Sequence, residues 1–322
     1  MKRRRLIGLA VLGVCLLAGV VVVRRGMRDP LYQGKTIKTW ALQIIASDAE
    51  THARSVALFR TMGTNAVPGL IRLLESRDPM WCKALWRATM NLSPKLRVRL
   101  LRHTRGAEQE LDHQAAARAL QLIGPDAKAA VPALARVLHG QERVARWDAA
   151  YALASIGKDA VPALVAALND QDPEARTAAI TALLHIGPGA EAAIPALFAR
   201  LQDDNPGVRL QASEALSAIG PAAGQVLIHA IERERGIVQQ RAAKVLMSMM
   251  FARRAAEPAL LKMASDEDPL SRAQAIETLA GLHLSDARVK ATITAALNDP
   301  APEVRTAATQ ALHDLGVGAA SK

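Results

Sequence analysis

Small and aliphatic residues recur along most of this chain with helical spacing. After Arg176, for example, Ala179, Leu183 and Ile186 follow at three, seven and ten positions. This spacing puts the three side chains on one side of an α-helix, where they can meet a neighbouring element. The pattern predicts a helix that ends at Gly187, because glycine readily adopts the left-handed conformation that closes a helix.

The same frame returns at intervals of 30 to 33 residues. Its first position falls at residues 52, 82, 113, 146, 176, 209, 239, 272 and 305, and five of these nine are arginine. Nine copies at this period indicate an α-helical solenoid. An aspartate or asparagine followed by proline predicts a helix start, because the side chain caps the helix and proline needs no amide donor. Such pairs are Asp172-Pro173, Asn205-Pro206 and Asp268-Pro269.

A second helix is predicted after the glycine of each repeat. A proline opens it and leucines follow two and six residues later, as at Pro162, Leu164 and Leu168. One helix pair cannot bury its apolar face alone, so successive pairs must stack on one another. The sequence therefore predicts an all-α, right-handed superhelix of about nine helix pairs over residues 48–322.

The phrase DPEARTAAITALLHIG at 172–187 resembles HEAT repeats, specifically the short repeats of the bilin-lyase-type HEAT family. The resemblance covers roughly residues 48–316 and implies the solenoid fold, with very little information about activity. In resembling families the arginine at the first position ties adjacent repeats together. The arginine column is therefore expected to be structural, although a phosphate-binding ladder is the alternative reading.

The N-terminus carries an apolar run, Leu6 to Val23, behind the basic residues MKRRR. Eighteen uncharged residues make a helix of about 27 Å, near the lower limit for crossing a membrane. Arg24 and Arg25 follow without a small-x-small cleavage site, which favours an uncleaved anchor over a cleaved signal peptide. We expect residues 1–28 to form the anchor, with the repeats on the periplasmic or extracytoplasmic side.

Residues 29–47 form a juxtamembrane segment with a helix of its own. Thr36 can cap this helix, whose apolar residues share one face. We expect that face to cover the open end of the first repeat. The residues concerned are Ile37, Trp40, Ala41, Ile44 and Ile45.

The net charge of +11 belongs mostly to the N-terminal arm. Residues 1–38 hold nine of the 41 Lys and Arg and one of the 30 acids, which leaves 32 against 29, or +3, for the remainder. A near-neutral array argues against nucleic acid as the partner. Cys15 and Cys82 are the two cysteines, and they predict no disulfide.

Two groups of residues depart from the repeat and are candidate partner-binding sites. Trp147 and Tyr151 are aromatic in columns that other repeats fill mainly with polar residues, and exposed aromatics often anchor interfaces. The segment 93–106 is basic and has no acid, which suits an acidic partner. Its candidate residues are Lys95, Arg97, Arg99 and Arg102. Packing against a loop and an ordinary solvated helix face are the respective alternatives.

The sequence offers no catalytic, cofactor or metal motif. Its eight histidines are scattered, and there is no His-Glu dipeptide of the kind that the deoxyhypusine hydroxylase branch of HEAT-like proteins needs for iron. The sequence predicts a non-catalytic, membrane-tethered scaffold that binds another protein, with no cofactor and no small-molecule substrate. Two alternatives stay open: a module that binds nucleic acid or an anionic surface, and a bilin-lyase-like enzyme or its chaperone subunit.

Overall fold

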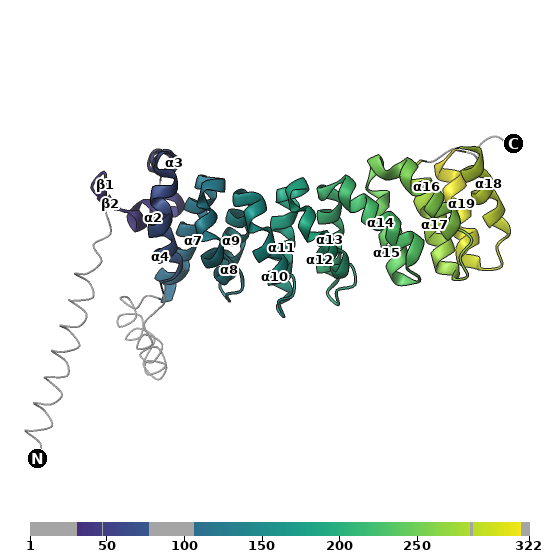
Figure 1. Ribbon diagram of the computed structural model, residues 1–322, viewed down its shortest axis with the longest axis horizontal. Coiled ribbons are helices and arrows are strands. Elements are labelled where there is room, and N and C mark those ends of the chain that lie inside the picture. Colours follow the sequence, from purple (N-terminus) through teal and green to yellow (C-terminus); the bar gives the residue numbers. More distant parts are fainter. Residues whose placement is uncertain (1–30, 47, 77–105, 284–285, 317–322) are drawn as a thin grey trace, which may run out of the picture.

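The computed structural model describes residues 31–46, 48–76, 106–283 and 286–316. In these ranges the protein is a rod of stacked helices, with the N-terminal hairpin and the C-terminal helices at opposite ends (Figure 1). The predicted anchor, Leu6 to Val23, lies outside the described residues.

The rod begins with a small β-hairpin that leads into a buried helix. Strands β1 (Leu31–Tyr32) and β2 (Lys35–Thr36) pair antiparallel, and the chain then enters α2 (Ile37–Ala46). The hydroxyl of Thr36 accepts a hydrogen bond from the backbone N–H of Thr39 at 3.2 Å, which satisfies a free donor of the first turn. Helices α3 (Ala49–Met62) and α4 (Val67–Leu74) complete this end.

The rest of the rod is a series of helix pairs, each with a first helix, A, and a second helix, B. The A helices are α7 (Gly106–Ile123), α9 (Arg143–Ile156), α11 (Pro173–Ile186), α13 (Pro206–Ile219), α15 (Ile237–Met247), α17 (Pro269–Gly281) and α19 (Pro302–Asp314). The B helices are α8 (Val131–Leu138), α10 (Val161–Ala167), α12 (Ile194–Arg200), α14 (Pro221–Arg233), α16 (Arg253–Met263) and α18 (Ala287–Ala295).

The helix starts predicted at Asp172 and Asn205 and the stop predicted at Gly187 are confirmed, whereas Pro258, predicted to open a second helix, lies inside α16. The side chains of Asp172 and Asn205 accept hydrogen bonds from first-turn N–H groups, at 2.9 Å from Glu174 and 2.8 Å from Gly207. At the other end of α11 the backbone of Gly187 has φ +61°, a conformation that most L-residues avoid. A short 3-10 turn, such as Gly187–Ala193, then leads into most B helices.

The A helices approach one another closely because the residue three positions after the first position of each repeat is alanine. This alanine is fully buried in the seven repeats from α7 onward: Ala116, Ala149, Ala179, Ala212, Ala242, Ala275 and Ala308. The side chains join one apolar core that runs along the rod, and the main contacts are between elements next to each other in the stack. Stability therefore comes from interfaces between neighbouring repeats, as the sequence indicates.

The described residues account for eight of the nine predicted copies. The described residues contain seven pairs, α3/α4, α7/α8, α9/α10, α11/α12, α13/α14, α15/α16 and α17/α18, followed by α19. The copy expected at Cys82 lies outside the described residues. Helices α2 and α4 both contact α7 directly.

Two helical stretches of the described chain are long and apolar enough to cross a membrane, Arg143–Ala167 and Pro173–Arg200. Each is an A helix and a B helix of one repeat, separated at a glycine of positive φ, Gly157 or Gly187. The chain reverses at these glycines and both helices pack in the stack, so these stretches belong to the solenoid core.

Candidate functional site

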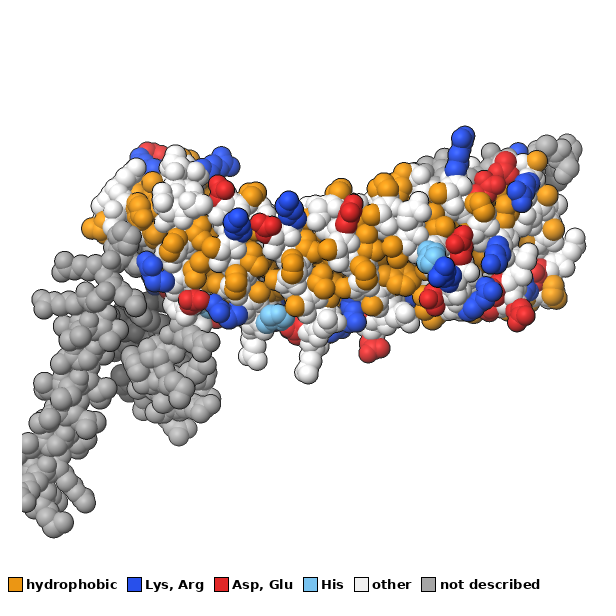
Figure 2. Space-filling view, in the orientation of Figure 1, with side chains coloured by type: hydrophobic (Ala, Val, Ile, Leu, Met, Phe, Trp, Pro, Cys, Tyr) orange, Lys and Arg blue, Asp and Glu red, His pale blue; other side chains and the backbone are white. Residues whose placement is uncertain are grey.

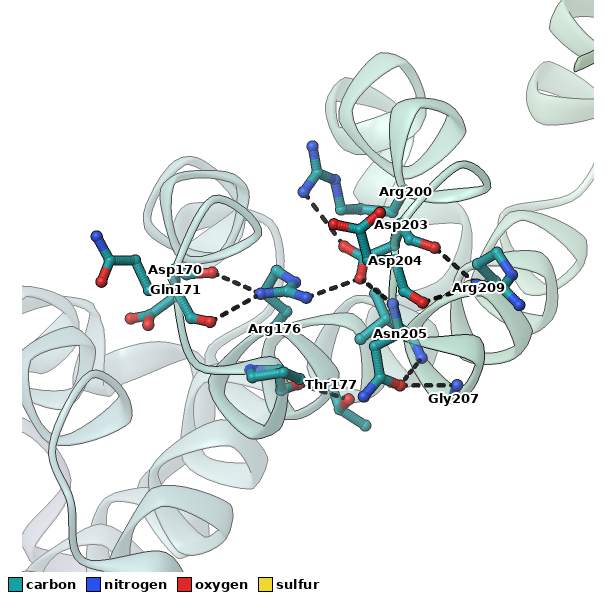
Figure 3. Close-up of polar contacts among 12 residues, drawn as sticks. Asp170, Gln171, Arg176, Thr177, Arg200, Asp203, Asp204, Asn205, Gly207 and Arg209 are labelled. Carbon is teal, nitrogen blue, oxygen red and sulfur yellow. Dashed lines mark hydrogen bonds and ion pairs between the residues drawn. The ribbon is translucent and has the colours of Figure 1, made fainter.

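The first position of the frame forms a ladder of polar contacts along the rod. We call its members the ladder residues: His113, Arg146, Arg176, Arg209, Gln239, Arg272 and Arg305. Nη1 of Arg176 donates to the carbonyl oxygens of Asp170 at 2.8 Å and Gln171 at 3.1 Å, while Nη2 lies 2.7 Å from Oδ1 of Asp203 (Figure 3). One side chain thus ties its own turn to the turn of the next repeat.

Neighbouring ladder residues repeat this contact. Arg272 bonds Asp299 of the following repeat at 2.7 Å, and Arg146 reaches Asp172 at the same distance. His113 replaces arginine and places Nδ1 2.6 Å from Glu142. The ladder is therefore structural, as the sequence predicts, and the guanidinium groups of Arg146, Arg176 and Arg272 are engaged by carboxylates of the protein itself.

The carboxylates of the ladder are stabilised in their charged form. Burial alone would raise the pKa of Asp203, but hydrogen bonds from Arg176 and from the backbone of Asn205 outweigh it and hold that pKa below the ordinary value. The hydrogen bond from Arg272 likewise lowers the pKa of Asp299. These aspartates are anionic at neutral pH and bind their arginines as ions.

The ladder changes at Gln239, in α15. This glutamine is fully buried, and its side-chain amide donates to the carbonyl of Ile231 in α14, the second helix of the preceding repeat. Arg235, from the loop before α15, takes over the pairing with Asp266 at 2.7 Å. Position 233, six residues before Gln239, is arginine, whereas the matching position before Arg209 is Asp203. The aspartate that would pair with Arg209 is therefore missing from the sequence.

Arg209 accordingly keeps the contacts with its own turn and lacks the contact with an aspartate of the next repeat. Its Nη1 donates to the carbonyls of Asp203 at 2.8 Å and Asp204 at 3.0 Å, within its own turn (Figure 3). No carboxylate among the described residues lies within ion-pair distance of it, in contrast to Arg146, Arg176 and Arg272. One side of this guanidinium is free to accept a partner.

A groove of about 620 Å³ opens between α13 and α15 at this point. Arg241 donates from Nη1 to the carbonyl of Leu201 at 2.7 Å, which ties α15 to the end of α12. Ser217 and Ser248 lie 2.7 Å apart and bridge the C-terminal ends of the two A helices. The residues that line the groove are Leu201, Arg209, Leu210, Ser213, Glu214, Ser217, Arg241, Lys244, Val245 and Ser248.

The lining of the groove is cationic and apolar. Arg209, Arg241 and Lys244 have no ion pair within the described part of the chain, and the one acid, Glu214, accepts a hydrogen bond from Gln211 at 2.9 Å. Leu210 is 59% exposed at the rim. The volume falls in the range of ligand pockets, and the lining offers an anionic ligand both charge and apolar contact.

Sequence reasoning missed this groove, although a signal for it was present. The acidic turn NDQD at 169–172 or QDDN at 202–205 becomes RERG at 233–236, and the ladder arginine becomes Gln239. This repeat has lost the aspartate that would pair with Arg209 and also its own ladder arginine, so the ladder is interrupted between α13 and α15.

The predicted aromatic pair does form a contact. The ring centroids of Trp147 and Tyr151 are 6.5 Å apart, and Tyr151 meets His185 of α11 edge-to-face at 5.5 Å. Trp147 is partly buried against the core, whereas Tyr151 is 37% exposed. The structure thus adds His185 to the pair. The other predicted residues, Lys95, Arg97, Arg99 and Arg102, lie outside the described residues.

The described side chains show no cluster that would hold a metal ion. Two carboxyls have a raised pKa. Burial raises that of Asp148, against the opposing effect of Arg118 at 3.1 Å, and burial together with a hydrogen bond to Asp286 raises that of Glu257. Neither carboxyl lines the groove between α13 and α15.

The stacked helix pairs and the ladder define this protein as an α-helical repeat solenoid. The family model for HEAT repeats matches residues 96–183, 161–247 and 256–321, and the chain belongs to the HEAT-repeat family. No curated protein matches the sequence.

Several solved structures resemble the chain. The complex of CpcE and CpcF of phycocyanin lyase from Nostoc sp. PCC7120 contains a chain that is 29% identical, with a TM-score of 0.37, over 47% of this chain and 97% of that one. The HEAT-like repeats protein of Thermococcus onnurineus NA1 is 14% identical, with a TM-score of 0.37 and coverages of 70% and 98%. Kap121p bound to Pho4p is 13% identical, with a TM-score of 0.49 and coverages of 88% and 38%.

Proposed function

We propose that this protein is a non-catalytic, membrane-tethered scaffold that binds a protein partner along its A helices. The observation that carries the proposal is a column of exposed aliphatic side chains two positions before the ladder residue. Leu111, Val144, Ile237 and Leu270 occupy it and are 43%, 47%, 52% and 57% exposed. They form two pairs in adjacent repeats, one on α7 and α9 and one on α15 and α17.

A column of this kind suits a partner that lies along the rod. Single exposed leucines are ordinary on a protein surface, but apolar side chains at matching positions of adjacent repeats offer aligned contacts. The visible face of the rod also carries a band of apolar side chains over α7 to α13, with charged side chains along its edges (Figure 2). An apolar centre with a polar rim is the usual composition of a protein interface.

Photo-crosslinking in living cells tests the proposal. A photoreactive amino acid placed at Val144 or Leu270 is expected to give one or a few defined protein adducts, identified by mass spectrometry. Lys158 is a matched control, because it is exposed in the turn at the opposite end of α9. Adducts of equal pattern and yield at all three positions contradict the proposal. Trp147→Ala and Tyr151→Ala then show whether the aromatic pair contributes to capture.

The membrane tether is supported by the length and basic flanks of Leu6 to Val23. We expect the full-length protein to remain in carbonate-washed membranes. We also expect its repeats to be digested by protease added to the extracytoplasmic side, and to be protected in inverted vesicles until detergent is added. A mature protein that lacks the first residues identifies a cleaved signal peptide, and repeats digested in inverted vesicles contradict the proposed side.

A further inference from the structure

We infer that the groove between α13 and α15 binds a short acidic segment of a partner protein, whose carboxylate takes the place of the missing ladder aspartate. This inference rests on the proposed scaffold function and names the chemistry of one contact. The first argument is Arg209. Its counterparts Arg176 and Arg272 each hold an aspartate of the next repeat at 2.7 Å, and Arg209 has the same anchoring to its own turn but no such aspartate.

The second argument is the charge around that position. Arg241 and Lys244 face the same groove from α15 and have no carboxylate partner in the described ranges, while Glu214 is the single acid of the lining. An acidic segment would neutralise this excess of positive charge, and charge complementarity favours association with such a partner. Guanidinium–carboxylate pairs are also stronger than neutral hydrogen bonds.

The third argument is the apolar part of the lining. Leu201 and Val245 are nearly buried below, and Leu210 is exposed at the rim. These side chains suit an aliphatic residue next to the carboxylate. A single-stranded nucleic acid would stack its bases on aromatic side chains, and no aromatic side chain is among the lining residues. The combination therefore favours an acidic peptide with aliphatic side chains over a phosphate backbone.

The protein's own undescribed segments do not have the charge to fill this groove. Residues 1–30 contain seven Lys and Arg and one acid, residues 77–105 contain eight and one, and residues 317–322 contain one lysine and no acid. All three segments are positively charged, as the groove is. The charge of these segments therefore favours another molecule as the source of the acidic group.

Fluorescence anisotropy with the purified full chain tests the inference. The probe is a labelled peptide in which aspartate and leucine alternate, compared with peptides that alternate asparagine or lysine with leucine. We expect the aspartate peptide to bind, the asparagine peptide to bind more weakly, and the lysine peptide not to bind. Added salt should weaken the binding of the aspartate peptide, because the contact is partly ionic.

Matched variants locate the contact. Lys244→Glu should weaken binding about tenfold or more, whereas Lys290→Glu, the same change on exposed α18, should leave it unchanged. Leu210→Ser should weaken binding, and Leu31→Ser, at an exposed leucine of the N-terminal hairpin, should not. All four side chains are exposed, so the variants are expected to fold, and circular dichroism checks this.

Three results would overturn the inference. The first is that the aspartate peptide does not bind. The second is that Lys244→Glu binds it as tightly as the wild type does. The third is that a thymidine oligonucleotide of equal charge binds more tightly and displaces the peptide. Each of them leaves the crosslinking at Val144 and Leu270 unaffected, so the groove can fail while the scaffold function stands. Tight peptide binding without specific crosslinks would show the opposite: the groove binds an acidic peptide, and the proposed docking along the A helices fails.

Discussion

Replacing Arg176 with methionine is expected to lower the free energy of unfolding by about 3–5 kcal/mol, the usual effect of removing one partner of a buried ion pair. The guanidinium makes three contacts that a thioether cannot make, with two carbonyls and with Asp203. Asp203 has a side chain only 3% exposed, so its charge would remain in a site that excludes water, with the longer contact to Arg200 at 3.3 Å as its remaining ion pair. Urea unfolding of the full chain, followed by circular dichroism, measures the loss.

Arg209→Met is the matched control, because Arg209 binds its own turn and lacks the cross-repeat aspartate. We expect it to lower the stability by about 1 kcal/mol, the value of ordinary hydrogen bonds. Equal losses in the two variants would show that the ion pair to the next repeat contributes nothing and that the carbonyl contacts carry the whole effect.

The effect of Arg176→Met should also depend on pH. In the wild type the pKa of Asp203 is below its ordinary value, so the pairing stabilises the fold above the unfolded pKa of about 3.9 and is lost as pH falls through the native pKa. In the variant burial remains and the largest opposing hydrogen bond is gone, so the pKa of Asp203 rises. The difference in stability between the two proteins should therefore be larger at pH 7 than at pH 3.

The repeat architecture could be predicted from the sequence because its determinants are local. The alanine at the third position, the proline at many helix starts and the glycine at many stops act within one helix, and the structure places Ala179 and Gly187 as expected. The structural role of the arginine column could also be predicted, since Arg176 and its acidic turns recur with the same period.

The groove could not be predicted in the same way, because it depends on how two successive repeats deviate together. Gln239 alone reads as a tolerated substitution, and Arg233 alone reads as a surface charge. Their joint effect appears only when Arg209 is seen without an aspartate and Arg235 is seen in contact with Asp266. His185 was missed for a related reason, since its contact with Tyr151 crosses from one repeat to the next.

The N-terminal end of the rod provides a second large effect. Trp40 is 3% exposed, donates from its indole N–H to the carbonyl of Tyr32 at 2.8 Å, and lies below the ammonium of Lys35, 4.5 Å from the ring centroid. It holds the hairpin and α2 against the first repeat and α7. Trp40→Ala should therefore lower the free energy of unfolding of this end by about 3–5 kcal/mol, the usual range for a buried aromatic reduced to alanine.

The loss of stability caused by Trp40→Ala should remain local, because each repeat is stabilised by its immediate neighbours. Hydrogen exchange followed by mass spectrometry should show faster exchange in α2, α3, α4 and the adjoining α7, with α17 and α19 unchanged. Trp147→Ala, at a tryptophan that is only partly buried, is the matched control and should have a smaller effect. Equally accelerated exchange in α17 would mean that the rod unfolds as one unit.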